Sequence, residues 1–234
     1  MKKLSFGAVA VAVMTLCAAG SASAGVVSLN FEGINATYTS STGSAFIGDF
    51  YNGGMSSDGT TGTNYGIGFS SNAQAICLNS LTVVCSNTSR GGLAPGSDQG
   101  GLFFLSGAET FMNVAAGFTT GFSFNYVSLS SPGAVNVYDG ANGTGTVLAT
   151  LNLTPNAGPC PGYSAGFCPF SPFGVNFAGT AHSVGFAGVA NQIAFDDVTF
   201  GSNVPGVPEP ETYALMLAGL ATVAGIARGR KASV

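Results

Sequence analysis

The residues of this 234-residue chain that are best suited to chemistry are carboxylates, and two of them are adjacent. Asp196 and Asp197 stand between apolar residues near the end of an expected strand, with no basic residue close by in the sequence. Neighbouring carboxylates repel each other unless a cation or the amides of a turn stabilise them. Two interpretations therefore stay open from this pair alone: a cation site, or one solvated and one turn-bonded aspartate.

Catalytic groups of other kinds are scarce. The single histidine, His182, lies at the start of an expected strand and has no acid near it in the sequence. There is no phosphate-binding glycine loop. Two carboxylates can suffice for a glycosidase, but tryptophan, which normally lines such a cleft, is absent. We expect a protein that is not an enzyme.

Four cysteines form two pairs with the same spacing, Cys77 with Cys85 and Cys160 with Cys168. In an exported protein an even number of cysteines predicts disulfides, and four allow three pairings. We favour the two local pairings, because each pair brackets a short stretch containing Gly, Asn or Pro that can turn back on itself. Each closed loop stabilises by about 2–3 kcal/mol. A zinc site is disfavoured, because ligand spacings of two to four residues and histidine partners are lacking.

The elements that must position these residues are predicted to be strands. Apolar residues recur at every second position, as in Phe122, Phe124 and Tyr126, and such residues share one face of a strand. Glycine, asparagine and proline clusters separate the runs. The expected strands include 26–31, 45–51, 65–70, 102–105, 122–127, 135–137, 147–151, 184–186 and 192–200. A helix is considered only at 109–116. The pattern predicts an all-β fold, an antiparallel β-sandwich of jelly-roll type. The 18 phenylalanines supply a core and argue against a disordered chain, despite 36 glycines.

Charge restricts the partners of the expected domain. Between residues 25 and 207 the only basic residue is Arg90, against eight acidic residues, which makes a formal charge of −7. Such a surface repels nucleic acid and anionic lipid. A neutral sugar, a divalent cation or another protein is compatible. Tyr51 and Tyr65 delimit a polar, turn-rich stretch and are the leading candidates to stack on sugar rings, with Tyr38 and Tyr163 as further candidates; the alternative is that they pack inside the fold.

Both ends of the chain carry targeting signals. Lys2 and Lys3 precede an apolar run, and a small-x-small site ends at Ala24, which predicts a helical signal peptide at 1–24 read by the general secretion machinery. At the other end, residues 213–227 are uncharged and are followed by Arg228, Arg230 and Lys231, the order of a stop-transfer segment. As a helix this stretch rises about 23 Å, short of the roughly 30 Å of a bilayer core.

This C-terminal arrangement resembles the PEP-CTERM proteins of Gram-negative bacteria. The matching residues are Val207, Pro208, Glu209 and Pro210, then the apolar transmembrane helix, then the basic end, which is thinner than in many members. The resemblance implies export across the inner membrane, transient anchoring, recognition by exosortase, and release or attachment at the cell surface or outside. It also implies an association with bacteria that make exopolysaccharide. The expected organisation is a signal peptide at 1–24, the sandwich at 25–200, a linker at 201–207 and the sorting signal at 208–234.

A second, weaker resemblance concerns the two ends of the domain. Asn30-Phe31-Glu32 near its start and the Phe-Asp-Asp-Val run ending at Val198 look like the first and last strands of carbohydrate-binding jelly rolls. That resemblance implies a structural calcium held by Glu32 with Asp196 or Asp197. No other cofactor is expected.

We therefore expect a non-catalytic surface or matrix protein of the biofilm that associates with exopolysaccharide. The alternative is a purely structural envelope or adhesion protein without a defined ligand. Ice binding is disfavoured, because it usually requires ranks of threonine along a solenoid, and Thr60, Thr61 and Thr63 form one cluster with no repeat.

Overall fold

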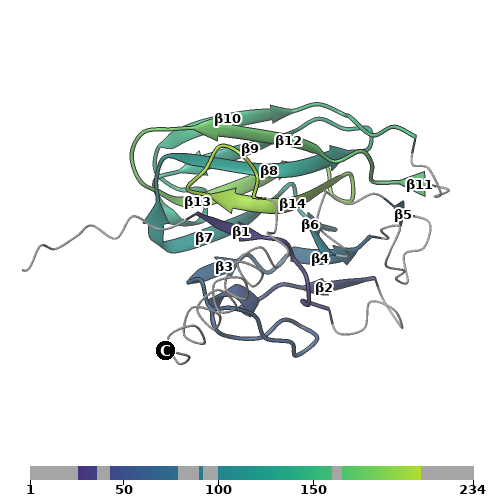
Figure 1. Cartoon of the computed structure of the whole chain (residues 1–234), viewed down its shortest axis with the longest axis horizontal. Helices are drawn as coiled ribbons and strands as arrows, with labels where there is room; N and C mark the ends of the chain where they lie inside the picture. The colour runs from purple at the N-terminus through teal and green to yellow at the C-terminus, as the bar shows by residue number, and fades with distance from the viewer. Residues whose placement is uncertain (1–25, 36–42, 79–89, 92–99, 160–164, 207–234) are drawn as a thin grey trace, which may run out of the picture.

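The computed structural model describes residues 26–35, 43–78, 90–91, 100–159 and 165–206 (Figure 1). The predicted signal peptide and the predicted C-terminal helix at 213–227 lie outside these residues. Two antiparallel sheets face each other, which confirms the predicted β-sandwich.

The larger sheet has seven strands. They are β1 (Val27–Leu29), β2 (Ser44–Phe46), β4 (Ala73–Cys77), β6 (Gly100–Phe104), β8 (Gly121–Ser128), β12 (Ser171–Asn176) and β14 (Ile193–Phe200). Their order is β12-β8-β14-β6-β4-β2, with β1 paired to β14 as well. The first and last strands of the domain are therefore neighbours, as the jelly-roll prediction requires.

The smaller sheet has five strands. They are β3 (Ile67–Phe69), β7 (Glu109–Phe118), β9 (Gly133–Tyr138), β10 (Val147–Leu153) and β13 (Ala181–Gly188). Their order is β10-β9-β13-β7-β3. From β6 onward the chain passes repeatedly between the two sheets, which is the connectivity expected of a jelly roll. Two short 3-10 turns, η1 (Phe50–Asn52) and η2 (Ala141–Gly143), join strands.

The helix considered at 109–116 is wrong, because this stretch belongs to β7. Thr110, Met112 and Val114 are buried at every second position, so the period is that of a strand. The strands β4 and β12 were not predicted. The residues of β4 are buried on both sides and show no alternation of apolar and polar types.

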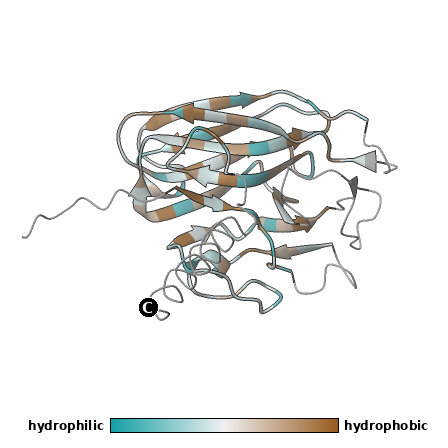
Figure 2. Cartoon of the chain, viewed as in Figure 1, coloured by the Kyte–Doolittle hydropathy of each residue, from teal (hydrophilic) through white to brown (hydrophobic). Residues whose placement is uncertain are grey.

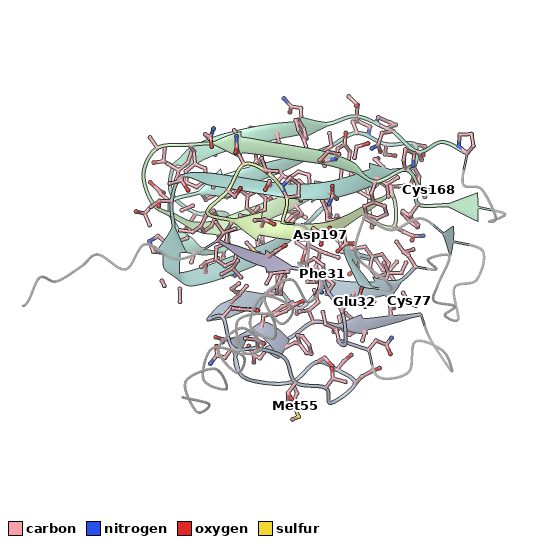
Figure 3. All side chains as sticks on the ribbon, in the orientation of Figure 1. Phe31, Glu32, Met55, Cys77, Cys168 and Asp197 are labelled. Atoms are coloured by element: carbon pink, nitrogen blue, oxygen red, sulfur yellow. The ribbon has the colours of Figure 1, made fainter. Side chains whose placement is uncertain are left out.

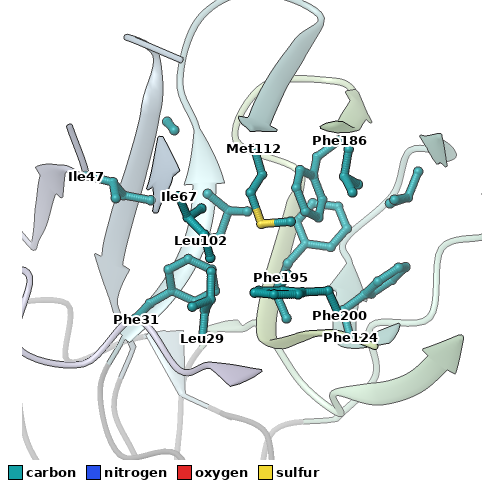
Figure 4. Close-up of a cluster of buried hydrophobic side chains, with 14 of the residues drawn as sticks. Leu29, Phe31, Ile47, Ile67, Leu102, Met112, Phe124, Phe186, Phe195 and Phe200 are labelled. Carbon is teal, nitrogen blue, oxygen red and sulfur yellow. The ribbon is translucent and has the colours of Figure 1, made fainter. Parts of the chain in front are cut away.

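Aromatic side chains fill the space between the sheets (Figure 4). The Phe186 and Phe195 rings, from opposite sheets, lie 4.9 Å apart between centroids, and Phe195 also contacts Phe124 at 5.5 Å. Edge-to-face pairs of this kind add about 0.5–1.5 kcal/mol to the free energy gained from burial. The predicted sharing of one face by Phe122, Phe124 and Tyr126 is confirmed, since all three belong to this core.

A second apolar cluster covers the outer face of the seven-stranded sheet. Val127 of β8 and Ala194 of β14 point away from the main core and pack with Phe167 and Phe170 from the segment before β12. Both strands, β8 and β14, are buried along their whole length. Hydrophobic and hydrophilic residues still alternate along the outer strands of the sandwich (Figure 2).

Candidate functional site

The adjacent aspartates occupy a junction in the seven-stranded sheet. One part of β14 pairs with β6, through Phe195 and Leu102, and the next part pairs with β1, through Val198 and Leu29. Asp196 and Asp197 lie between these two pairings, where the register of β14 against β8 also shifts. A bulge of this kind redirects side chains. The junction therefore brings the carboxylates to the point where β1 ends and β6 begins.

Glu32 reaches the same junction from the end of β1. Its Oε1 accepts a hydrogen bond of 2.8 Å from the backbone N–H of Gly100, the first residue of β6. Phe31 has a φ of 57°, an uncommon left-handed conformation that turns the chain after β1. A Cβ at Gly100 would collide with the Phe31 carbonyl oxygen, so only glycine permits this close approach. Glu32 and Asp197 lie near each other in Figure 3.

Both aspartates are fully buried, so the interpretation that one of them is solvated is wrong. The turn-bonded part of that interpretation is correct, because the Asp197 N–H donates to Asp196 Oδ1 at 2.7 Å. Asp197 Oδ2 accepts from Asn125 Nδ2 at 3.0 Å, whereas its buried Oδ1 has no hydrogen-bond partner among the described residues. Asp197 also has a φ of 47°. Strained backbone and an unsatisfied buried oxygen together are typical of functional sites.

The environment of Asp197 disfavours its charged form. Burial raises the pKa of its carboxyl from 3.8 to about 7, the hydrogen bond from Asn125 lowers the pKa, and the nearby Glu32 carboxylate raises it. Without a cation, this site therefore binds a proton near neutral pH.

The junction offers oxygen ligands of the kind that calcium prefers. Within the described ranges, no group of three or more His, Cys, Asp and Glu side chains is arranged to hold a metal. Glu32 and Asp197 supply two carboxylates, and the unsatisfied Asp197 Oδ1 is the atom that a cation would satisfy. The side chains present thus fit an oxygen-coordinated ion completed by backbone carbonyls or water, rather than a site built from carboxylates alone.

The two candidate tyrosines border a small hollow beside the same junction, with a volume of about 190 Å³. Tyr51 is only 4% exposed, and its hydroxyl oxygen accepts a hydrogen bond of 3.0 Å from the Phe31 N–H, so its ring faces are not available for stacking. Tyr65 is 42% exposed, and its ring centroid lies 6.2 Å from that of Tyr51. Glu32 also lines this hollow. Tyr65 is therefore the member of the pair whose ring can meet a ligand.

A larger hollow, with a volume of about 610 Å³, lies on the outer face of the five-stranded sheet. Its polar lining residues come from η1, β7, β13 and the turn containing η2: Asn52, Asn113, Asp139, Asn142 and His182. Sequence reasoning missed this hollow. The run from Asp139 to Gly143 was predicted only as a turn, because the residue types that make turns do not differ from those that contact ligands.

The buried cysteines Cys77 and Cys168 are both disulfide-bonded. Cys85 and Cys160 lie outside the described residues, so the two local pairings stay a prediction. The short strands β5 (Arg90–Gly91) and β11 (Ala165–Gly166) pair in parallel; β5 follows the first predicted loop in the sequence and β11 lies within the second.

Several predicted residues lie outside the described residues: the sorting residues Val207 to Pro210, the basic residues Arg228, Arg230 and Lys231, and the tyrosines Tyr38 and Tyr163.

Thr60, from the threonine cluster, donates its hydroxyl hydrogen to the Ile34 carbonyl at 2.6 Å. The expected linker is bound to the sandwich for most of its length, since Ser123 Oγ donates to the Ser202 carbonyl and the Gly206 N–H donates to Thr199 Oγ1.

Residues 206–231 match the family model described as the PEP-CTERM protein-sorting motif, which implies an exported protein processed by exosortase. Among solved structures, the chain is similar to the K1 cleaved adhesin domain of Lys-gingipain from Porphyromonas gingivalis W83. The identity is 14% and the TM-score 0.35, over 76% of this chain and 98% of the adhesin domain. No curated protein matches the chain. In the described part, no helix is long and apolar enough to cross a membrane.

Proposed function

We propose that this chain, a PEP-CTERM protein by its residues 206–231, is a non-catalytic module that exosortase sorts to the cell surface or the extracellular matrix, where it associates with exopolysaccharide. The observation that carries the sugar-binding part is the hollow beside the β1–β6 junction, where the exposed Tyr65 ring stands among small polar residues. An aromatic ring presents a flat apolar face, and neighbouring hydroxyl and amide groups match sugar hydroxyls. The acidic domain without lysine is compatible with a neutral ligand.

The proposal includes a structural calcium at the junction, held by Glu32 and Asp197 with Asp196 positioned beside them. When bound, the ion would supply positive charge between carboxylates that otherwise repel each other. Asp196 would keep the backbone of Asp197 in place through its hydrogen bond to the Asp197 N–H. Because Glu32 and Tyr65 line one hollow, the ion would also order the wall of the sugar site.

Calcium binding is tested by thermal unfolding of the mature domain at pH 7.5 in calcium and in chelator. We expect a higher midpoint in calcium for the wild type and no calcium effect for Asp197→Asn, because that substitution removes the charge that faces Glu32. A direct calorimetric titration with calcium serves as the second measurement. Equal midpoints and no heat of binding in the wild type would contradict the calcium site while leaving the sugar proposal intact.

Sugar binding is tested by glycan-array and affinity-electrophoresis measurements with exopolysaccharide from the producing bacterium. Replacing Tyr65 by Ala should weaken binding roughly tenfold, since one stacked ring is worth on the order of 1.4 kcal/mol. Tyr65→Phe keeps the ring face and should bind nearly as well as the wild type. Phe46→Ala is the matched control, because Phe46 is 46% exposed and lines neither hollow. Retention on no glycan would favour the purely structural alternative.

Sorting is tested independently by mass spectrometry of the protein recovered from the cell surface and the medium. We expect a C-terminus close to Pro208–Glu211 in cells that contain exosortase, and accumulation of the uncut chain in an exosortase-deficient strain. An exported protein that still ends at Val234 in wild-type cells would refute processing at this motif.

A further inference from the structure

The two hollows described above are bordered by consecutive residues of the chain. Tyr51 and Tyr65 line the smaller hollow, and the residues that follow them, Asn52 and Gly66, line the larger one. The Tyr65 N–H donates to the Tyr51 carbonyl oxygen at 2.9 Å, so the two segments of the rim are held together. The exposed Tyr65 ring therefore lines the smaller hollow, and the residue that follows it borders the larger one.

The floor of the larger hollow is made of small residues. Gly66, just before β3, Gly68 within β3, and Ala115 on β7 line it without long side chains. A Cβ added at Gly68 would meet no atom of the described residues within 4 Å, so these residues leave space above this position. Met112 and Val114 point to the core from the same part of β7, so the floor is supported from below. A flat ligand can lie on such a surface without requiring protein side chains to move.

The walls of the larger hollow present amides and one carboxylate. Asn113 Nδ2 donates to Asn142 Oδ1 at 2.8 Å, and the Asn142 N–H donates back to Asn113 Oδ1 at 2.7 Å. These bonds hold the η2 turn against β7 and orient the remaining amide hydrogens. Asp139 uses Oδ1 to accept from the Thr146 N–H. Backbone and side-chain bonds thus preorganise this wall before any ligand arrives.

The chemistry of the lining selects a neutral polyhydroxyl ligand. Among the residues that the structure describes, no lysine or arginine lines either hollow, whereas Asp139 lines the larger and Glu32 the smaller. An anionic chain would be repelled by both carboxylates, while amides donate to and accept from hydroxyl groups. A volume of about 610 Å³ falls in the range of specific ligand sites.

We propose that the two hollows form one track for the interior of a neutral polysaccharide chain. One sugar ring stacks on Tyr65 at the rim, and the sugars that follow it lie on the glycine floor between β3 and the η2 turn, with their hydroxyls bonded to Asn142 and Asp139. The inference rests on the sugar-binding function proposed above. It adds the larger hollow, a chain length beyond one or two sugars, and a preference for uncharged chains.

The experiment fills the larger hollow while leaving Tyr65 in place. Gly68→Leu introduces a side chain into the empty space, and Asn152→Leu is its control, because Asn152 is an exposed position on β10 that lines neither hollow. Circular dichroism and the thermal midpoint show that each variant is folded. Binding is measured by calorimetry with purified exopolysaccharide of the producing bacterium and with its hydrolysis fragments of one or two sugars.

We expect the wild type and Asn152→Leu to bind the long chain at least about tenfold more tightly than the fragments. Gly68→Leu should lose that advantage and bind chain and fragments alike. Asn142→Gly, which tolerates the positive φ at that position, should weaken long-chain binding with little effect on the fragments.

The outcomes separate the two proposals. If Tyr65→Ala weakens binding but Gly68→Leu binds the long chain like the wild type, the track is refuted and the Tyr65 site stands. Preferential binding of uronate-rich chains over neutral ones also refutes the track. If the wild type binds neither chain nor fragments, both proposals fail.

Discussion

The buried carboxyl of Asp197 should make the stability of this domain depend on pH in an unusual direction. Its pKa is raised from 3.8 to about 7 in the folded protein, chiefly by burial. The folded state therefore holds a proton between these pH values that the unfolded state has released. The free energy of unfolding therefore falls as the pH rises from 3.8 to about 7, and this loss of stability is complete above that range. Most acidic residues with folded-state partners act in the opposite direction.

The magnitude follows from the size of the shift. The pKa of Asp197 is raised by about 3 units, and each unit is worth about 1.4 kcal/mol, so at pH 8 the carboxyl lowers the free energy of unfolding by about 4 kcal/mol. Asp197→Asn removes this term, since an amide does not ionise. The variant preserves the shape of the side chain, can still accept the hydrogen bond from Asn125, and asparagine tolerates the φ of 47°.

The assay is urea unfolding of the mature domain in chelator at several pH values from 4 to 8. The quantity to plot is the free energy of unfolding of Asp197→Asn minus that of the wild type, which cancels the titration of the other groups. This difference should increase by about 4 kcal/mol between pH 4 and 8. Asp49→Asn, at an exposed carboxylate, supplies the baseline for removing a surface charge. A difference for Asp197→Asn that does not change with pH would show that the carboxyl is not desolvated in solution.

Three further substitutions test the packing around the site and in the core. Gly100→Ala should destabilise the domain by more than about 2 kcal/mol in urea unfolding, because its Cβ would collide with the backbone of Phe31. Gly158→Ala should be nearly neutral, since among the described residues its Cβ meets one atom within 4 Å, at 3.8 Å. Phe186→Ala should cost about 3–5 kcal/mol by leaving a core cavity, and a cost below 1 kcal/mol would contradict the packing described. Tyr51→Phe should cost about 1–2 kcal/mol in urea unfolding, because the Phe31 N–H donates to the tyrosine hydroxyl.

Much of the fold was predictable because local patterns carry it. Phe122, Phe124 and Tyr126 alternate with polar residues, and their positions on one strand face follow from the geometry of a strand. The failures have the same origin. The stretch 109–116 contains two alanines and no clear turn residue, so its period was ambiguous until Met112 and Val114 were seen to face the core. β4 gave no alternation because the segment that contains Phe167 and Phe170 covers the outer face of its sheet.

The candidate site was predictable only in part. Glu32 and Asp197 were associated through a resemblance of the domain ends, and the pairing of β1 with β14 makes them neighbours. That both aspartates are buried, and that Tyr51 belongs to the core whereas Tyr65 faces outward, could not be inferred from a turn-rich stretch in which both tyrosines have similar neighbours. Burial depends on which distant segments cover a residue.

The sequence by itself determined the C-terminal sorting motif, the acidic charge of the domain without lysine, and the β class. A motif, a charge count and a period of two residues can all be read from the order of the residues alone. Only the tertiary structure decided at which residues β14 stops pairing with β6 and starts pairing with β1. That junction determines which carboxylates lie close together and which of them is desolvated. The tertiary structure also decided which hollow borders the residue after Tyr65. These properties arise from contacts between segments that are far apart in the sequence, such as β1 and β14, and no local pattern encodes them.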